Sequence, residues 1–485
     1  MASKVYFMND RANSLQESTP FKAVKLLRDA GLKTLFKKGD TVGIKIHMGE
    51  YGNSLNLRPH WVNSIVEEVK KLGGNPVIVD CNTITFSDFS SRAMESDHRR
   101  SVSRHGFNEE TMGCPIWICD GEYGFDDVQV EIPNGVYMRH TFMGKKLLDL
   151  DAVIVVTHFK GHPMGVYGGA IKNIGIGMGS KRGKISTHFM NHPVYGIQNM
   201  TVNQAAAKQA SEGPSPTLLE RTIKSCPFDA FEWKDDMLHF DQEKCGLCAG
   251  CFSSALFGGM LSIKPEITAT WPPTIADAAA GYMNAIGKDK FLFLNYAFDI
   301  SPWCDCVNFH DKPLVPNIGI FASKDPVAID LACIEAAESK AGMPESKTDE
   351  FGFGDAGTER FTNISSIAKV SQWAQCNAGE FNGIGSTEYT LVESEPADET
   401  DFWFPPYTPD NTFGFANKEA LRNGNYDVGQ YFYDLPRLSL SDLHTKPKGM
   451  IEEISILDEV PDEALSEAFA PDEPKMETPV PNAVL

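Results

Sequence analysis

Runs of apolar residues alternate with amphipathic stretches along the first 80 residues. We expect strands in KVYFM, DTVGIKIHM and NPVIVDC, because each is apolar almost throughout. Between them, PFKAVKLLRDAGL and WVNSIVEEVKKL place apolar residues on one helical face, and Gly31 and Gly73 follow as stop signals. Apolar strands that alternate with such helices predict a mostly parallel sheet with helices on both faces.

The same alternation resumes further along the chain. LLDLDAVIVVTHF, KFLFLNYAF and NIGIFAS are expected strands, and IADAAAGYMNAIGK and DPVAIDLACIEAAESKAG are expected helices. Asp325 is a natural N-cap of the second helix, and Pro326 suits its first position. CPIWIC reads as a further strand, in which we interpret Cys114 and Cys119 as core thiols rather than metal ligands.

This pattern divides the chain into five segments. Residues 1–199 form the first part of an α/β domain, and residues 266–345 form its second part. Between them, residues 200–265 form a ferredoxin-like insert. Residues 346–450 are rich in aromatic residues with weak periodicity, which predicts an irregular extension, and the Pro- and acid-rich residues 451–485 predict a flexible tail.

Charge and composition narrow the class of protein. The net charge of −21 and the pI of about 5.0 disfavour binding to nucleic acids. The sequence contains neither an apolar run of membrane-spanning length nor a signal-peptide pattern at MASKVYFMND, so we expect a cytoplasmic protein. Its 11 cysteines are clustered rather than spread as a disulfide framework, which favours metal binding.

Three cysteines at two-residue spacing, in CGLCAGC, give the strongest chemical signal in the chain. A bacterial ferredoxin repeat runs C-x2-C-x2-C-x3-C-P, and its fourth cysteine ligates the cluster of the other repeat. Here that fourth position is Ala255, whereas the upstream repeat keeps only its last cysteine, which is followed by proline. We therefore predict one 4Fe–4S cluster held by Cys226, Cys245, Cys248 and Cys251. The alternative is a zinc site on the same residues, although zinc ribbons usually carry paired CxxC knuckles.

Polar residues follow four of the expected strands. They are His47 and Glu50 after the first, Asp80, Cys81 and Asn82 after the next, His158, Lys160 and His162 after the third, and Asp299, Cys304 and Cys306 after the fourth. The carboxyl ends of parallel strands line the crevice in which open α/β sheets bind ligands. These side chains would form one pocket if the strand order brings the ends together, although each alone is more often a structural hydrogen-bonding residue.

Two further motifs belong to this constellation. The glycine-rich run GGAIKNIGIGMGSKRGK offers backbone N–H groups and four cations that would bind an anion, namely Lys172, Lys181, Arg182 and Lys184. The run matches no nucleotide-binding fingerprint, and its alternative interpretation is a tight loop with solvated cations. In CDC, Cys304 and Cys306 predict a second metal site or a redox-active thiol pair, with Asp305 or His310 as further ligands. The alternative is a pair of thiols that line the docking surface of the cluster.

Together these stretches resemble the domain-of-unknown-function 362 family (DUF362), in its ferredoxin-carrying branch. The resemblance covers residues 3–342 and rests on IKIHMGEYGN, HFKGH, GGAIKN, GSKRGK, the cluster motif, SPWCDC and ASKDPVAIDLA. It implies an iron–sulfur protein of α/β architecture and no general reaction. The chain departs from the pattern because its insert retains the ligands of one cluster where many ferredoxin modules carry two. The extension and the tail have no counterpart.

The motifs favour an iron–sulfur redox protein whose single 4Fe–4S cluster exchanges electrons with an anionic substrate or a redox partner protein at the crevice. The candidate catalytic residues are His158, His162 and Lys172, because imidazoles move protons near neutral pH. The candidate substrate-binding residues are His47, Glu50, Lys160, Lys181, Arg182 and Lys184. One alternative is a non-catalytic electron-transfer or assembly subunit of a larger enzyme. Another is a metal-dependent isomerase or lyase with a His/Lys pocket, for which nickel-dependent racemases are a fold-level analogy.

Overall fold

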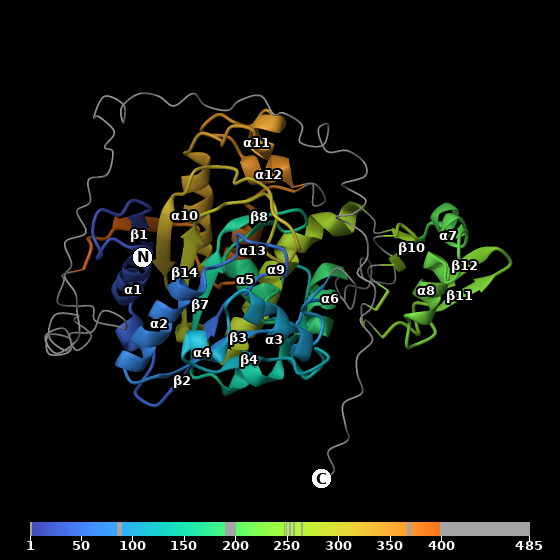
Figure 1. Ribbon diagram of the computed structural model, residues 1–485, viewed down its shortest axis with the longest axis horizontal. Coiled ribbons are helices and arrows are strands. Elements are labelled where there is room, and N and C mark those ends of the chain that lie inside the picture. Colours follow the sequence, from blue (N-terminus) through green and yellow to red (C-terminus); the bar gives the residue numbers. More distant parts are fainter. Residues whose placement is uncertain are drawn as a thin grey trace, which may run out of the picture. The chain divides into compact units, whose positions relative to one another are not determined.

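An eight-stranded sheet forms the centre of the fold (Figure 1). The computed structural model of the chain describes residues 2–397 except 85–89, 190–199, 247, 249, 252–253, 256–257, 263–264 and 366–369. The strands of the sheet, in spatial order, are β16 (Tyr389–Glu393), β1 (Ser3–Asn9), β15 (Gly319–Ser323), β14 (Phe291–Ala297), β7 (Ala152–His158), β2 (Thr41–Lys45), β3 (Asn75–Asp80) and β4 (Ile116–Ile118). Only β15 runs against its neighbours, so the sheet is mostly parallel, as the sequence predicts.

The central strands are buried on both faces, which explains why they are apolar throughout. Every residue of β7 and of β14 is buried. Val153 and Val155 enter one hydrophobic core, whereas Ile154 and Val156 enter the core on the opposite face. This alternation follows from the two-residue period of a strand.

Helices cover both faces of the sheet. One core receives apolar side chains from α1 (Thr19–Asp29), α2 (Pro59–Lys71), α3 (Glu95–Arg104) and α4 (Glu109–Met112). The other receives them from α5 (Ala170–Gly175), α9 (Pro265–Ile286), α10 (Pro326–Glu338) and α13 (Ala374–Phe381). The expected caps of α10 are confirmed, because the Asp325 carboxylate accepts the Val327 and Ala328 N–H groups and Pro326 takes the first position.

Shorter elements connect these layers. Two antiparallel hairpins lie outside the central sheet. One pairs β5 (Asp127–Glu131) with β6 (His140–Gly144), and the other pairs β8 (Lys160–His162) with β9 (Val166–Gly168). The remaining helical elements of this part are η1 (Leu32–Thr34), η2 (Lys145–Asp149), α6 (Lys181–Phe189), η5 (Lys288–Lys290), α11 (Lys347–Glu350) and α12 (Arg360–Ile364). The β8–β9 hairpin follows β7 and leads into the glycine-rich run, which contains α5.

The segment between α6 and α9 has a small core of its own. Its elements are β10 (Thr201–Val202), α7 (Gln204–Ala210), α8 (Leu218–Lys224), β11 (Phe231–Lys234), β12 (Met237–Phe240) and β13 (Leu261–Ser262). A capping box between Thr217 and Glu220 starts α8. Leu219, Phe231 and Ala255 pack into the core, so the position where a second repeat would carry its fourth cysteine is buried.

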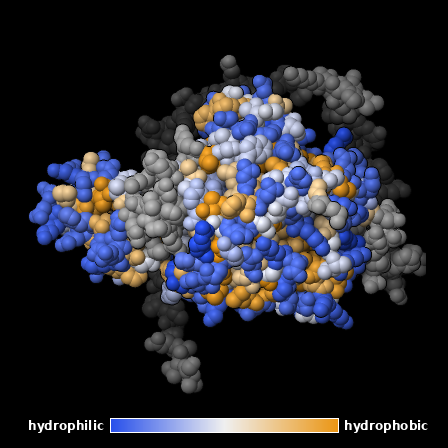
Figure 2. Space-filling model, turned by 180° about the vertical axis from the view of Figure 1, so that it is seen from behind, coloured by the Kyte–Doolittle hydropathy of each residue, from blue (hydrophilic) through white to orange (hydrophobic). Residues whose placement is uncertain are grey.

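The described part of residues 346–450 is more regular than the weak periodicity indicated. It contributes α11, α12, α13 and the edge strand β16, which pairs in parallel with β1. Residues 398–450 of the expected extension and the expected tail, 451–485, lie outside the described residues. None of the helices that the structure describes combines the length and apolar character needed to cross a membrane. The face in Figure 2 carries mainly hydrophilic residues with scattered apolar ones.

Candidate functional site

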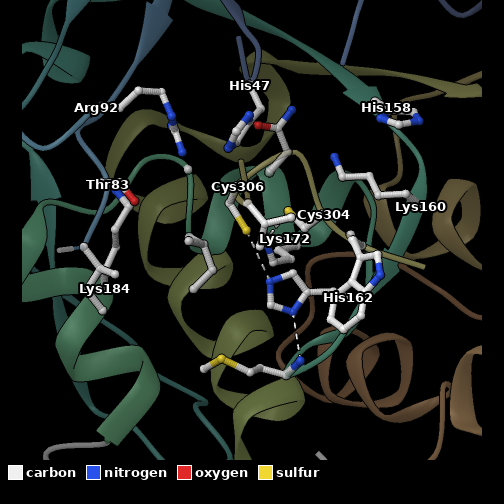
Figure 3. Close-up of a pocket in the computed structure, with 18 of the residues that line it drawn as sticks. His47, Thr83, Arg92, His158, Lys160, His162, Lys172, Lys184, Cys304 and Cys306 are labelled. Carbon is white, nitrogen blue, oxygen red and sulfur yellow. Dashed lines mark hydrogen bonds between the residues drawn. The ribbon is translucent and has the colours of Figure 1, made fainter. Parts of the chain in front are cut away.

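A cavity of about 570 Å³ lies at the carboxyl ends of the central strands (Figure 3). The strands β14, β7, β2 and β3 are consecutive in the sheet, so the residues that follow them meet at one edge. Eight of the residues expected at strand ends line this cavity, namely His47, Asp80, Cys81, His158, Lys160, His162, Cys304 and Cys306. The strand order therefore brings the strand ends together, which is the condition that the predicted single pocket requires.

A turn after β14 presents Cys304 and Cys306 to the cavity. The Val307 N–H donates to the Cys304 carbonyl oxygen at 3.1 Å, which closes the turn. A hydrogen bond from the Cys306 thiol lowers the pKa of Cys304 well below its usual range, and the nearby ammonium groups of Lys172 and Lys160 act in the same direction against the effect of burial. The same hydrogen bond and burial raise the pKa of Cys306. The pair therefore favours a thiolate at Cys304 and a thiol at Cys306.

His162 lies beside the two sulfur atoms with its protonation fixed by the backbone. Its Nδ1 accepts the N–H groups of Met164 at 3.1 Å and Gly165 at 2.7 Å. Burial lowers the pKa of His162 to about 4, so the ring is neutral near pH 7 and its proton is on Nε2. Nε2 lies 3.7 Å from Cys306 Sγ (Figure 3), where it donates toward the thiol pair.

Lys172 is held in the cavity by a cap on a short helix. The buried Asp330 carboxylate, from α10, accepts the N–H groups of Ala170 at 2.7 Å and Ile171 at 2.9 Å, and so fixes the start of α5. A Cβ on Gly169 would collide with this carboxylate, which explains the glycine in GGAIKN. Three residues after Gly169, Lys172 places its Nζ 3.5 Å from Cys304 Sγ.

Asp305 fixes two of the expected site residues from behind the cavity. One carboxylate oxygen accepts from His158 Nδ1 at 2.8 Å, and the other accepts from Lys160 Nζ at 2.9 Å. His158 Nε2 faces the Phe298 carbonyl oxygen at 2.9 Å, so both of its ring nitrogens face acceptors. In this arrangement His158 positions Asp305 and has no free nitrogen for proton transfer.

The opposite wall contains a buried network of charges. Arg92 donates to Glu50 at 3.1 Å and approaches Asp80 at 3.9 Å, while Asp80 accepts from Lys45 at 3.0 Å. Burial opposes ionisation of Asp80, but Lys45 and its other cationic neighbours outweigh it and lower the pKa of this carboxyl. His47 accepts the Gly49 N–H at Nδ1, at 3.1 Å, so its Nε2 also carries the ring proton.

The cavity is cationic although the chain is acidic. Its described lining contains four cations, Arg92, Lys160, Lys172 and Lys184, and one carboxylate, Asp80. Its walls are otherwise largely apolar, with Ile84, Met164, Ile176, Trp303, Val307 and Phe309. Hydrogen-bond donors at His47 and His162 add to the positive potential. The arrangement suits a small anion with an apolar part.

Several expected residues lie away from the cavity lining. Glu50 is buried behind Arg92, Lys181 donates to the Thr83 carbonyl oxygen at 2.6 Å, and Arg182 pairs with Asp127. Asp299 pairs with Arg58, and His310 contacts Ser54. Sequence reasoning missed Arg92, His188 and Trp303 among the lining residues. Arg92 lies in a stretch without strand or motif, where the sequence offers no signal for it.

His162, Cys304 and Cys306 form a group that could bind a metal ion. Their ligand atoms all lie within 4.8 Å of one another. One imidazole and two thiolates are a donor set typical of zinc and related soft metals. Two features oppose a metal cation here. Nε2 of His162 carries the ring proton, so the imidazole would have to release its backbone donors and turn to offer a lone pair. The adjacent ammonium of Lys172 would also repel a cation.

The four cysteines of the expected cluster also converge. A Cβ on Gly250 would lie 2.8 Å from the Ser225 carbonyl oxygen, and one on Gly246 would collide with the Phe228 ring. Gly246 and Gly250 therefore pack directly on the residues around Cys226. Burial and the nearby sulfurs of Cys245, Cys248 and Cys226 raise the pKa of Cys251 to about 12. Such a concentration of thiols, close enough to disfavour one another's charge, fits the ligand set of one cluster.

Comparison with known proteins gives the family of the chain. No curated protein sequence matches it. Among solved structures, the lactate racemase apoprotein from Thermoanaerobacterium thermosaccharolyticum is similar over 61% of this chain and 51% of its own, with 11% identity and a TM-score of 0.30. The chain thus spans about half the length of that protein. The model of the domain of unknown function DUF362 matches residues 42–335, and the chain therefore belongs to the DUF362 family.

Proposed function

We propose that the protein is an iron–sulfur redox protein of the ferredoxin-carrying DUF362 branch, with a pocket for an anionic small molecule. The packing of Gly246 and Gly250 on the residues around Cys226, and the closeness of the four cysteines, carry this proposal. Cys226, Cys245, Cys248 and Cys251 would hold one 4Fe–4S cluster, which supplies one-electron transfer when bound. The spacing of the cysteines in the sequence and the contacts of the described residues support the same four ligands independently.

The pocket supplies the second part of the proposed function. Lys172 would bind the anionic group of the substrate, because Arg92 and Lys160 are partly neutralised by Glu50 and Asp305. Lys184, which Asp120 partly compensates, would add to the positive potential. The neutral rings of His47 and His162 would donate hydrogen bonds from Nε2 to substrate oxygen atoms. Apolar walls would exclude water from the reacting atoms, which strengthens each of these electrostatic contacts.

Anaerobic purification with quantification of iron, sulfide and other metals tests the cluster. We expect about four iron and four sulfide per chain, with visible absorbance that dithionite bleaches and an EPR signal after reduction. Cys226→Ser should lose this iron, whereas the matched variant Cys114→Ser, at a buried core thiol, should keep it. Zinc in place of iron, or a complete cluster in the Cys226→Ser variant, would contradict the proposal.

A second candidate function is a metal-dependent isomerase or lyase. The observation that favours it is the group His162, Cys304 and Cys306, which offers a metal ion three soft donors beside Lys172. A metal ion there would act as a Lewis acid on a bound substrate. Stoichiometric nickel or zinc that is lost in Cys304→Ser and retained in Cys226→Ser would support this candidate over the first.

A further inference from the structure

The two pocket thiols lie in a turn whose geometry permits a disulfide. Residues two apart span at most about 7 Å in an extended chain, and a turn shortens that span into the range of about 4.4–6.8 Å that disulfides require. The hydrogen bond from Val307 to Cys304 shows that the chain turns here. Cys304 and Cys306 therefore need little backbone movement to pair.

The residues beside the two thiols favour thiol–disulfide exchange over a purely structural role for the cysteines. Lys172 Nζ lies 3.5 Å from Cys304 Sγ, and His162 Nε2 lies 3.7 Å from Cys306 Sγ. An adjacent ammonium stabilises the thiolate, which is the attacking species in thiol–disulfide exchange. An imidazole N–H beside the second sulfur can stabilise negative charge on it when it loses its proton. Figure 3 shows both sulfurs facing the same cavity as Lys172 and His162.

The cavity itself restricts what can reach the thiols. Lys172 forms no salt bridge with a carboxylate among the described residues, so it would attract negative charge to the Cys304 sulfur it contacts. Lys184 lines the same cavity, but Asp120 partly compensates its charge. Trp303 and Phe309 line the same cavity and would pack against an apolar or aromatic part of a ligand. Its volume of about 570 Å³ admits a small molecule but no folded protein.

We infer that Cys304 and Cys306 are a redox-active dithiol that exchanges with small anionic disulfides bound in this pocket. The inference deepens the proposed function, because it rests on the anionic ligand of the same pocket and specifies its reacting group. It assigns Cys304 as the attacking cysteine and Cys306 as the resolving cysteine.

The exchange balances in two displacement steps. The Cys304 thiolate attacks one sulfur of the ligand disulfide, that S–S bond breaks, and the other ligand sulfur leaves as a thiolate with the electron pair. The Cys306 thiol then releases its proton to this thiolate, and its sulfur attacks Cys304 Sγ, which expels the second ligand thiolate. One thiolate and one thiol of the protein are oxidised to a disulfide, and the ligand disulfide is reduced to one thiol and one thiolate. Two equivalents of a small thiol reverse the reaction.

Two chromogenic aromatic disulfides of different charge test this inference on the purified full chain. They are 5,5′-dithiobis(2-nitrobenzoate), which carries two carboxylates, and neutral 4,4′-dithiodipyridine. A tryptic peptide spanning residues 291–324 contains Cys304 and Cys306 and no other cysteine, so mass spectrometry follows these two thiols alone. We expect limiting anionic reagent to leave this peptide lighter by two hydrogen atoms and without an adduct.

The charge preference and the order of attack have separate readouts. Relative to free cysteine, the anionic reagent should react with this peptide at least about tenfold faster than the neutral one. Cys306→Ser should retain an adduct on Cys304, whereas Cys304→Ser should lose the preference for the anionic reagent. Preference for the neutral reagent, or adducts on both cysteines without a disulfide, would overturn the inference. The comparison of the two reagents uses the wild-type protein, so its result does not depend on whether a variant folds.

The test is separate from that of the cluster. Quantified iron and sulfide decide the proposed cluster, whereas the peptide readout decides the dithiol whether or not iron is present. A stoichiometric metal that blocks both reagents until a chelator removes it would overturn the dithiol in favour of a metal site at His162, Cys304 and Cys306.

Discussion

The ammonium of Lys172 lies 3.5 Å from the sulfur of Cys304, although 132 residues separate the two in the chain. Lys172 reaches this place because Asp330 caps α5, and Cys304 because the chain turns after β14. Buried charges are costly unless a partner compensates them, and the described residues offer Lys172 a thiolate rather than a carboxylate. A sulfur and a cation are thereby placed together where an anionic ligand would enter.

Substitution of Lys172 should change the charge preference of Cys304 alkylation. In Lys172→Met, the rate with iodoacetate relative to that with neutral iodoacetamide should fall about tenfold, because the cation that attracts the carboxylate is lost. The peptide that contains Cys304 gives both rates by mass spectrometry. Lys33→Met, at an exposed lysine outside the cavity lining, should leave the ratio unchanged. An unchanged ratio in Lys172→Met would show that this lysine does not set the potential at the thiol.

The close contact between Gly246 and the Phe228 ring predicts a compensating pair of substitutions. Gly246→Ala places a methyl group against the Phe228 ring and should push the loop from the Cys226 segment, so iron content should fall. Phe228 is 45% exposed, so Phe228→Ala should cost little stability. The double variant should recover iron, because removal of the ring makes room for the methyl group. Equal iron in Gly246→Ala and in the wild type, measured after anaerobic purification, would argue against one shared site.

Asp305 should contribute to stability through its two buried partners. In Asp305→Asn, His158 loses the carboxylate that it contacts and Lys160 loses the carboxylate that compensates its charge, which should lower the free energy of unfolding by about 3 kcal/mol. Urea unfolding measures this loss. Asp289→Asn, at an exposed position, should change it by less than about 0.5 kcal/mol. Addition of Lys160→Met should recover part of the loss, and if it deepens the loss instead, the pair is not coupled as the distances indicate.

The sheet and much of its pocket could be predicted from the sequence because both follow from local patterns. Apolar runs locate β2, β3, β7 and β14, and parallel strands place their carboxyl ends together, which explains why His47, His162 and Cys304 were expected at one edge. Arg92 could not be predicted, because it reaches the cavity from a segment without regular pattern. Its role follows from the partner Glu50, which lies 42 residues earlier and contacts it only in the folded chain.

The same limit applies to residues whose role depends on a long-range contact. The tautomer of His162 is set by the N–H groups of Met164 and Gly165, which a hairpin brings to Nδ1. The sequence motif HFKGH does not distinguish His158 from His162, yet Nδ1 of His158 contacts the Asp305 carboxylate. Two histidines four residues apart thus acquire different chemistry from partners that the local sequence does not specify.

His98 should make the protein sensitive to acid. It is fully buried, neither ring nitrogen has a hydrogen-bond partner among the described residues, and Arg92 lies nearby. Burial, with a further contribution from Arg92, lowers the pKa of His98 to about 3 from an ordinary value of 6.5, although Asp80 at 3.7 Å acts in the opposite direction. Between these two values the unfolded chain binds the proton and the folded chain does not.

Stability from this histidine is therefore present above pH 6.5 and is lost as the pH falls toward 3. At pH 5 the loss should be about 2 kcal/mol relative to pH 7.5. Urea midpoints at pH 7.5, 6 and 5 should fall less steeply for His98→Leu, which keeps the site apolar and removes the titrating group, than for the wild type. His239→Leu, at an exposed position, serves as the control and should follow the wild-type slope. Parallel slopes for His98→Leu and the wild type would mean that His98 takes up its proton in the folded protein, with Asp80 as its counter-ion.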